Sequence, residues 1–415
     1  MLPQCAPKVG VTVWAAPQSS RRGEYLTRRG LPVRRLILLL LSGALGGCAT
    51  PPASSPFEPY LEDGLFTASA ERVSADDLFT LSDAMRHYMN VDVAREVHSD
   101  GLPRGLVKAL SRHDRIMLDY DSTITRTAAQ TFDARKGNCL SLVIMTAAFA
   151  KELGLQVTYQ TVATDETWSR SDDMLFYSTH VNISLDRREI DSKQGYDPGR
   201  MLTVDFLPAA EILGQRRRAI SEDTVVAMYM NNRAAEALAR QQIDEAYWWV
   251  RGAIVRAPNF LNSYNTLGVV YRRHGDLHAA EQVLNHLLGR NPQDRQALSN
   301  LSTVLDGLGR TEESDAVRAR LARLEPYPPY HFFLLGRAAI ERGDFGAAKS
   351  LFEKEVGRAD YNGEFHFWLG IAYLRLGELK AARKQLAIAV ENSTTGKDHE
   401  LYAAKLQRLR SYDVH

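Results

Sequence analysis

The sequence predicts an α+β domain followed by an all-α repeat solenoid. Two patterns predict this order: an apolar helix followed by β-rich runs occupies the middle of the chain, and small residues recur with a 34-residue period in the C-terminal half. The chain has 415 residues, 45% of them hydrophobic, and chains beyond roughly 250–300 residues usually divide into domains. The expected domains are residues 71–215 and 227–396.

Charge and composition exclude several classes of function. The chain carries 51 Lys and Arg against 50 Asp and Glu, so it has no basic excess and we expect no nucleic-acid partner. Its three cysteines cannot form a CxxC zinc site or a disulfide scaffold. The sequence has no phosphate loop, dinucleotide fingerprint or closely spaced His/Asp/Glu set, so we expect no cofactor and no metal.

The start of the chain has the pattern of a secretory leader. Arg34 and Arg35 precede an apolar run at residues 36–41, and small residues follow up to Cys48. These are the parts of a signal peptide, and an apolar run of this length is too short to span a bilayer. We therefore expect residues 1–47 to be removed.

Residues 45–48 read Leu-Gly-Gly-Cys, which resembles the lipobox of bacterial lipoproteins. The resemblance implies that Cys48 is lipidated and anchors the chain to a membrane. Ala49, in place of an Asp after the lipidated cysteine, implies the outer membrane, so we expect a lipid-anchored protein of the bacterial cell envelope that faces the periplasm. Two alternatives stay open: an uncleaved apolar anchor, and a translation start downstream of Met1.

Residues 48–70 are expected to be a flexible tether, because residues 51–59 are rich in Pro and Ser. From residue 74 to about 111 the apolar residues keep a 3.6-residue period, which predicts helices. Ser74, with Asp77 three residues later, is the expected N-cap of the first of them.

A cysteine, a histidine and an acid lie on successive predicted elements. These are a loop, an apolar helix and three β-rich runs, at residues 132–139, 140–153, 155–162, 176–184 and 201–206. Cys139 would lie at the first turn of the helix, where the macrodipole favours a thiolate and Gly137 allows close approach. His180 on the second run could take the thiol proton, and Asp205 on the third could orient the imidazole.

Each of these residues has a simpler interpretation. Cys139 could be a small buried hydrophobic residue, and His180 could be an ordinary strand histidine with its hydrogen bonds satisfied. Asp191 and Asp197 also follow His180 and compete with Asp205. We prefer Asp205 because apolar residues flank it.

The segment from about residue 120 to 208 resembles the bacterial transglutaminase-like domain, a relative of the papain-fold cysteine proteases. The resemblance is carried by Arg135 and by residues 137–141, 180–182 and 204–206. It implies a papain/transglutaminase-like fold and acyl transfer from an amide through a thioester. Cys139 would be the nucleophile, His180 the base and then the acid, and Asp205 the orienting residue.

The same resemblance implies an oxyanion site at the start of the helix. The backbone N–H of Cys139 would supply one donor, and Asn138 and Gln130 are the candidates for the second. Water as acceptor would make the protein a peptidase or amidase, and an amine would make it a crosslinking enzyme. The resemblance favours hydrolysis over crosslinking.

The C-terminal half repeats every 34 residues. Pro recurs at 258, 292 and 326, Gly at 275, 309, 343 and 377, and Ala at 246, 280, 348 and 382. This resembles the tetratricopeptide repeat (TPR), in which small residues let two antiparallel helices approach closely. Five units fit residues 227–396, and residues 397–415 form a polar capping helix. Met230 and Ala234 make the first unit irregular, which fits docking on a preceding domain.

The TPR resemblance implies a concave groove that holds a protein or peptide partner. Candidate groove residues lie on the inner helices: Asn231, Asn265, Arg272, Arg273 and Arg337. The sequence thus favours a Cys-His-Asp acyl-transfer enzyme guided by a solenoid. The alternative is a non-catalytic assembly protein that uses the papain-like fold as a docking module.

Overall fold

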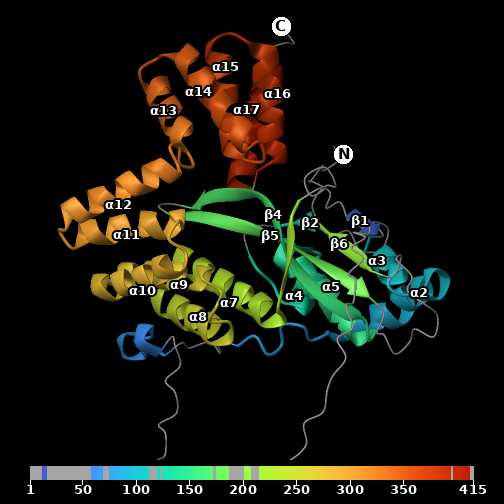
Figure 1. Ribbon diagram of the computed structural model, residues 1–415. Helices are drawn as coiled ribbons and strands as arrows, with labels where there is room; N and C mark the ends of the chain where they lie inside the picture. The colour runs from blue at the N-terminus through green and yellow to red at the C-terminus, as the bar shows by residue number, and fades with distance from the viewer. Residues whose placement is uncertain are drawn as a thin grey trace, which may run out of the picture.

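The computed structural model describes residues 12–15, 58–68, 74–111, 119–121, 124–171, 174–186, 201–206, 215–393 and 396–411. An α+β region with a five-stranded sheet is followed by paired helices that form a solenoid (Figure 1). Cys48 and the acids Asp191 and Asp197, which competed with Asp205, lie outside the described residues.

The sheet is antiparallel throughout, in the order β1-β6-β5-β4-β7. Its strands are β1 (Thr12–Ala15), β4 (Gln156–Ser171), β5 (Met174–Asp186), β6 (Leu202–Asp205) and β7 (Arg217–Ile220). The three expected β-runs thus form its centre. Strand β1 falls where we expected only a signal peptide. Its sequence Thr-Val-Trp-Ala has high β-propensity and pairs along the edge of β6.

Short helices lie between β1 and β4 in the chain. They are α1 (Asp83–Tyr88), α2 (Ala94–Asp100), α3 (Arg104–Ser111) and α4 (Ala128–Ala134), and a parallel pair of two-residue strands, β2 (Asp119–Tyr120) and β3 (Lys136–Gly137), leads to α5 (Cys139–Glu152). The first N-cap is Ser82, which accepts from Met85 N–H. The prediction of Ser74 was wrong because its hydroxyl closes a local turn with Asp76 N–H at 3.0 Å.

The solenoid consists of helix pairs. Its helices are α7 (Glu222–Ala239), α8 (Ile243–Arg256), α9 (Asn262–His274), α10 (Leu277–Arg290), α11 (Arg295–Gly307), α12 (Thr311–Leu324), α13 (His331–Glu341), α14 (Phe345–Arg358), α15 (Gly363–Arg375), α16 (Leu379–Glu391) and α17 (Gly396–Ser411). A Cβ at Gly268 would lie 2.8 Å from Leu284 Cδ2. Gly268, which recurs on the 34-residue period as Gly336 and Gly370, is therefore what allows α9 and α10 to pack closely.

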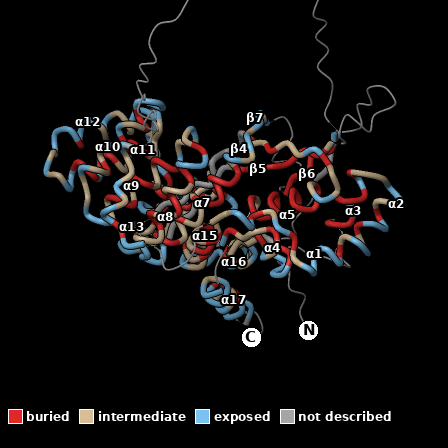
Figure 2. The backbone as a smooth tube through the Cα atoms, turned by 90° about the horizontal axis from the view of Figure 1, so that it is seen from below, coloured by how far each residue is buried: buried red, intermediate tan, exposed pale blue. Residues whose placement is uncertain are grey.

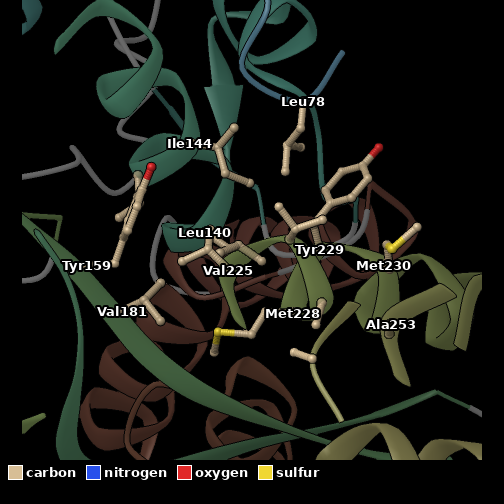
Figure 3. Close-up of a cluster of buried hydrophobic side chains, with 14 of the residues drawn as sticks. Leu78, Leu140, Ile144, Tyr159, Val181, Val225, Met228, Tyr229, Met230 and Ala253 are labelled. Carbon is tan, nitrogen blue, oxygen red and sulfur yellow. The ribbon is translucent and has the colours of Figure 1, made fainter. Parts of the chain in front are cut away.

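The first solenoid helix packs on the α+β region. Figure 3 shows Leu140 and Ile144 of α5, Val181 of β5, and Val225 and Tyr229 of α7 lying together in one apolar cluster. Buried stretches (red) run through α5, β5 and α7 in Figure 2. The α+β region and the first repeats therefore share one core, which explains why the first repeat departs from the 34-residue pattern.

The solenoid core divides between α12 and α13. One cluster of buried side chains ends at Leu305 of α11, and another begins at Tyr330 just before α13. Leu335 of α13 is 46% exposed, whereas Leu267 and Leu369, at the same place in their repeats, are almost fully buried. The repeat pattern continues across this junction, but the packing does not.

The exposure of Leu335 predicts that one substitution has unequal effects at equivalent repeat positions. Leu369→Ala should lower the free energy of unfolding by about 2–5 kcal/mol, because it removes a buried side chain. Leu335→Ala should lower it by less than about 1 kcal/mol. Urea unfolding followed by tryptophan fluorescence measures both. Equal losses would mean that α12 and α13 pack together in solution.

Residues 58–68 lie against the outside of the first two repeats. Phe66 stacks on Tyr247 with centroids 3.9 Å apart, and Asp63 Oδ1 accepts from Tyr247 Oη at 2.6 Å and from Arg251 Nε at 2.7 Å. The expectation of a flexible tether over all of residues 48–70 was therefore wrong for this part. It relied on the Pro/Ser content and overlooked the aromatic residues, which find aromatic partners on the solenoid.

The β4–β5 hairpin reaches the second part of the solenoid (Figure 1). Trp168 of β4 donates its backbone N–H to Tyr361 Oη at 2.8 Å, and the two rings meet edge to face. Arg358 of α14 lies 5.5 Å above the Trp168 ring. This hairpin connects the sheet that carries His180 to helices almost 200 residues further along the chain.

Candidate functional site

Cys139 is the first residue of α5. Asn138 is the N-cap, and its Oδ1 accepts from Ser141 N–H at 2.9 Å and from Ser141 Oγ at 2.8 Å. A Cβ at Gly137 would lie 2.8 Å from Ser141 Cβ, so glycine is needed for the loop to reach the helix. The thiol is half-buried and in no disulfide. A partly exposed cysteine at a helix N-terminus is the environment of reactive thiols rather than of inert ones.

His180 and Asp205 meet at the centre of the sheet. His180 Nε2 lies 2.6 Å from Asp205 Oδ1, and both residues are buried. Cys139 lies close enough to His180 for its charge to raise the pKa of the imidazole. The structure therefore brings together the thiol, the imidazole and the carboxylate that the sequence singled out, in the order that lets the imidazole exchange a proton with the thiol.

The surroundings of His180 favour its protonated form. Burial lowers the pKa of His180, but the hydrogen bond to Asp205 and the interactions with Cys139 and the Asp205 charge raise it to about 9. His180 is thus a cation at neutral pH, and this is the form that can give a proton to a leaving group.

Asn182 is a site residue that we did not single out from the sequence. Its Nδ2 donates to Asp205 Oδ2 at 2.8 Å, and it is fully buried. Residues 180, 182 and 184 alternate along β5 with the apolar Val181, Ile183 and Leu185 of the core. That alternation of polar and apolar residues was the available signal, since i and i+2 side chains of a strand share one face.

Both candidates for the second oxyanion donor use their side-chain oxygen in a helix cap. Gln130 is exposed, and its Oε1 accepts from Thr127 N–H at 3.1 Å in the capping box of α4. Asn138 Nδ2 donates to Thr125 Oγ1 at 2.9 Å. Both side chains are thus helix caps. Ser141 N–H and Leu142 N–H both donate to Asn138, so the N–H groups of Cys139 and Leu140 are the candidate backbone donors at the start of α5.

The five groove candidates do not form one cluster. Asn265 Oδ1 accepts from Asn300 Nδ2 at 2.9 Å, while the guanidinium of Arg337 lies 3.8 Å above the ring of Trp368, on a later repeat. Arg272 and Arg273 are half-buried at the end of α9. Asn231 on α7 has a buried Oδ1 without a hydrogen-bond partner among the described residues.

The described part of the chain contains no group of three His, Cys, Asp or Glu side chains placed to hold a metal ion. None of its helices is both long and apolar enough to cross a bilayer.

Comparisons with known proteins identify the C-terminal half. The tetratricopeptide repeat family matches residues 265–326 and 333–396. No curated protein matches the chain. Solved structures similar to it include a thermophilic TPR protein of Thermus thermophilus (20% identity, 44% of this chain and 99% of that chain, TM-score 0.29).

Two further solved structures are PilF of Pseudomonas aeruginosa (16% identity, 46% of this chain and 94% of that chain, TM-score 0.27) and MamA of Desulfovibrio magneticus RS-1 (19% identity, 42% and 97%, TM-score 0.25). The two stretches matched by the family end and begin on either side of the junction between α12 and α13. Together with the 34-residue pattern, the family match shows that the C-terminal region of this chain is a TPR solenoid, a fold that binds protein partners.

Proposed function

We propose that this chain is an acyl-transfer enzyme with a transglutaminase-like thiol site, which its TPR solenoid directs to a protein or peptide substrate. One observation carries the proposal: His180 is hydrogen-bonded to the buried Asp205 carboxylate and lies within electrostatic reach of Cys139 at the start of α5. Three groups in this relation activate a nucleophile on several unrelated folds. An ordinary strand histidine could use Asp205 as a hydrogen-bond partner, but it would need no thiol beside it.

The reaction proceeds in two halves. The Cys139 thiolate attacks the carbonyl carbon of an amide, and the charge that forms on oxygen faces the N–H groups at the start of α5. The C–N bond then breaks as the His180 imidazolium gives its proton to the leaving amine, which leaves a thioester on Cys139. Neutral His180 next takes a proton from water as water attacks the thioester, and the thiolate departs. An amine in place of water would give a crosslink.

The same proposal includes an anchor. Cys48, lipidated after removal of the leader, would hold the protein on the periplasmic side of the outer membrane. Removal of the leader would take β1 with it and leave β6 as the edge of the sheet. Metabolic labelling with a palmitate analogue tests this anchor, since Cys48→Ala should abolish the label.

The expected activity can be measured without a known substrate. A peptide library is incubated with the wild-type protein or with Cys139→Ala in the presence of a biotinylated amine, and mass spectrometry detects the products. New carboxyl termini that depend on Cys139 would demonstrate hydrolysis, and biotinylated peptides would demonstrate transfer to an amine. Identical products with both proteins would contradict the proposed activity.

The non-catalytic scaffold is the second candidate, and the TPR solenoid is the observation that favours it. It differs from the enzyme in one measurable respect. A strain lacking the chain, complemented with Cys139→Ala, should behave like wild type if the protein is a scaffold and like the deletion if it is an enzyme.

A further inference from the structure

A polar link joins the thiol helix to the solenoid. Thr125, almost fully buried before α4, accepts at its hydroxyl from Asn138 Nδ2 at 2.9 Å and from Asn232 Nδ2 at 3.2 Å. Its backbone N–H donates to Glu236 Oε1 at 2.6 Å. Asn138 is the residue before Cys139, whereas Asn232 and Glu236 belong to α7, the first solenoid helix. One threonine therefore connects the two regions.

The side chain of Asn138 is fixed at both ends. Its oxygen accepts from Ser141, and its nitrogen donates to Thr125. Ser141 Oγ also accepts from Arg126 N–H at 2.9 Å, so the loop that carries Thr125 contacts the first turn of α5 twice. An N-cap determines where a helix begins. Whatever holds Thr125 in place therefore holds Cys139 and its N–H group in place.

The residues that hold Thr125 lie on one side of α7. Val225, Tyr229, Asn232 and Glu236 are spaced by four, three and four residues, which places them on one helix face. Val225 and Tyr229 belong to the core shared with α5 (Figure 3). Asn232 and Glu236 contact Thr125. Burial raises the pKa of Glu236, partly offset by its bond to Thr125. Burying a carboxyl group lowers the stability of the fold unless the group is hydrogen-bonded, so the bond from Thr125 N–H offsets the burial of Glu236.

We propose that Asn232 and Glu236 of the solenoid are positioning residues for Cys139. On this view, the first repeat is part of the thiol site and not only a module that recruits the substrate. The inference rests on the proposed function, because it concerns the reactivity of the same thiol.

The test compares full-length variants by the rate at which iodoacetate alkylates Cys139, measured by peptide mapping at pH 7. Asn232→Ala and Glu236→Ala together should lower this rate by about tenfold, since small displacements of a reacting group have large kinetic effects. Glu236→Gln keeps an oxygen that accepts from Thr125 N–H, so it should react within about twofold of wild type. Asp223→Ala, which removes an exposed carboxylate from the same helix, is the matched control.

The outcomes separate this inference from the proposed function. If the double variant folds and alkylates like wild type, the inference is wrong and the proposed function stands. If the wild-type thiol shows no dependence on His180, both are wrong. Should Glu236→Ala fail to fold, Asn232→Ala alone decides, because it removes only a half-buried amide. A slower reaction for that variant with an unchanged melting temperature would support positioning.

Discussion

Replacing Asp205 by alanine is expected to lower the free energy of unfolding by about 3–5 kcal/mol, because it removes one member of a buried charged pair. Asp205 is fully buried and accepts from His180 at 2.6 Å and from Asn182 at 2.8 Å. Without the carboxylate, a buried imidazolium and a buried amide lose their partner. The side chains cannot reach water instead, since both donors are also buried.

The same change should make Cys139 less reactive. The hydrogen bond to Asp205 is the largest influence that raises the pKa of His180. Its loss leaves burial to favour the neutral imidazole, which stabilises a neighbouring thiolate less well. We expect alkylation of Cys139 at neutral pH to slow by about a hundredfold, within the range known for general acid–base groups.

Two further variants make the Asp205 prediction specific. Asp205→Asn keeps the volume, so it should be less destabilising than alanine but should also slow alkylation. Asp133→Ala, at an exposed position on α4, should change neither quantity. Urea unfolding and peptide mapping after alkylation give the two measurements. If Asp205→Ala unfolded and reacted like wild type, His180 and Asp205 would not act as a pair.

The sequence predicted the structure well at positions where the backbone conformation or the close packing of two elements restricts which residue type fits. Gly137 and Asn138 at a helix start, and the 34-residue spacing of Pro, Gly and Ala, each identified a backbone constraint. The same local logic predicted β-runs on either side of His180, and the structure has strands there. Residues paired across strands were harder to find: Asn182 was predicted to lie on a strand, but its bond to Asp205 depends on the register of β5 and β6.

Tertiary contacts explain most of the differences between the sequence-based predictions and the structure. Gln130 was a candidate oxyanion donor under the family resemblance, yet its side-chain oxygen belongs to the capping box of α4. Nothing local distinguishes Leu335 from Leu369, although one is exposed and the other buried, because the difference arises from the packing of α12 and α13. The contact between Thr125 and Glu236 spans 111 residues. No local pattern predicts such a contact.

The protonation of His180 should be visible in how Cys139 chooses between two reagents. Iodoacetate is an anion and iodoacetamide is neutral, so an imidazolium beside the thiolate attracts only the first. The pKa of His180 is raised to about 9, so the imidazole is charged below that pH and neutral above it. The ratio of the two alkylation rates should therefore be high near pH 7 and fall as the pH rises through about 9.

The variant His180→Ala supplies the control for this titration, because it removes the only group in the proposed pair that changes the ratio. Its ratio should be low and independent of pH, and its alkylation by iodoacetate near pH 7 should be about a hundredfold slower than in wild type. A ratio in wild type that fell near pH 6.5, the ordinary value for histidine, would mean that burial cancels the effects of Asp205 and Cys139 on the pKa of His180. His180 would then be neutral at pH 7 and could act only as a base, so the leaving amine would need another proton donor.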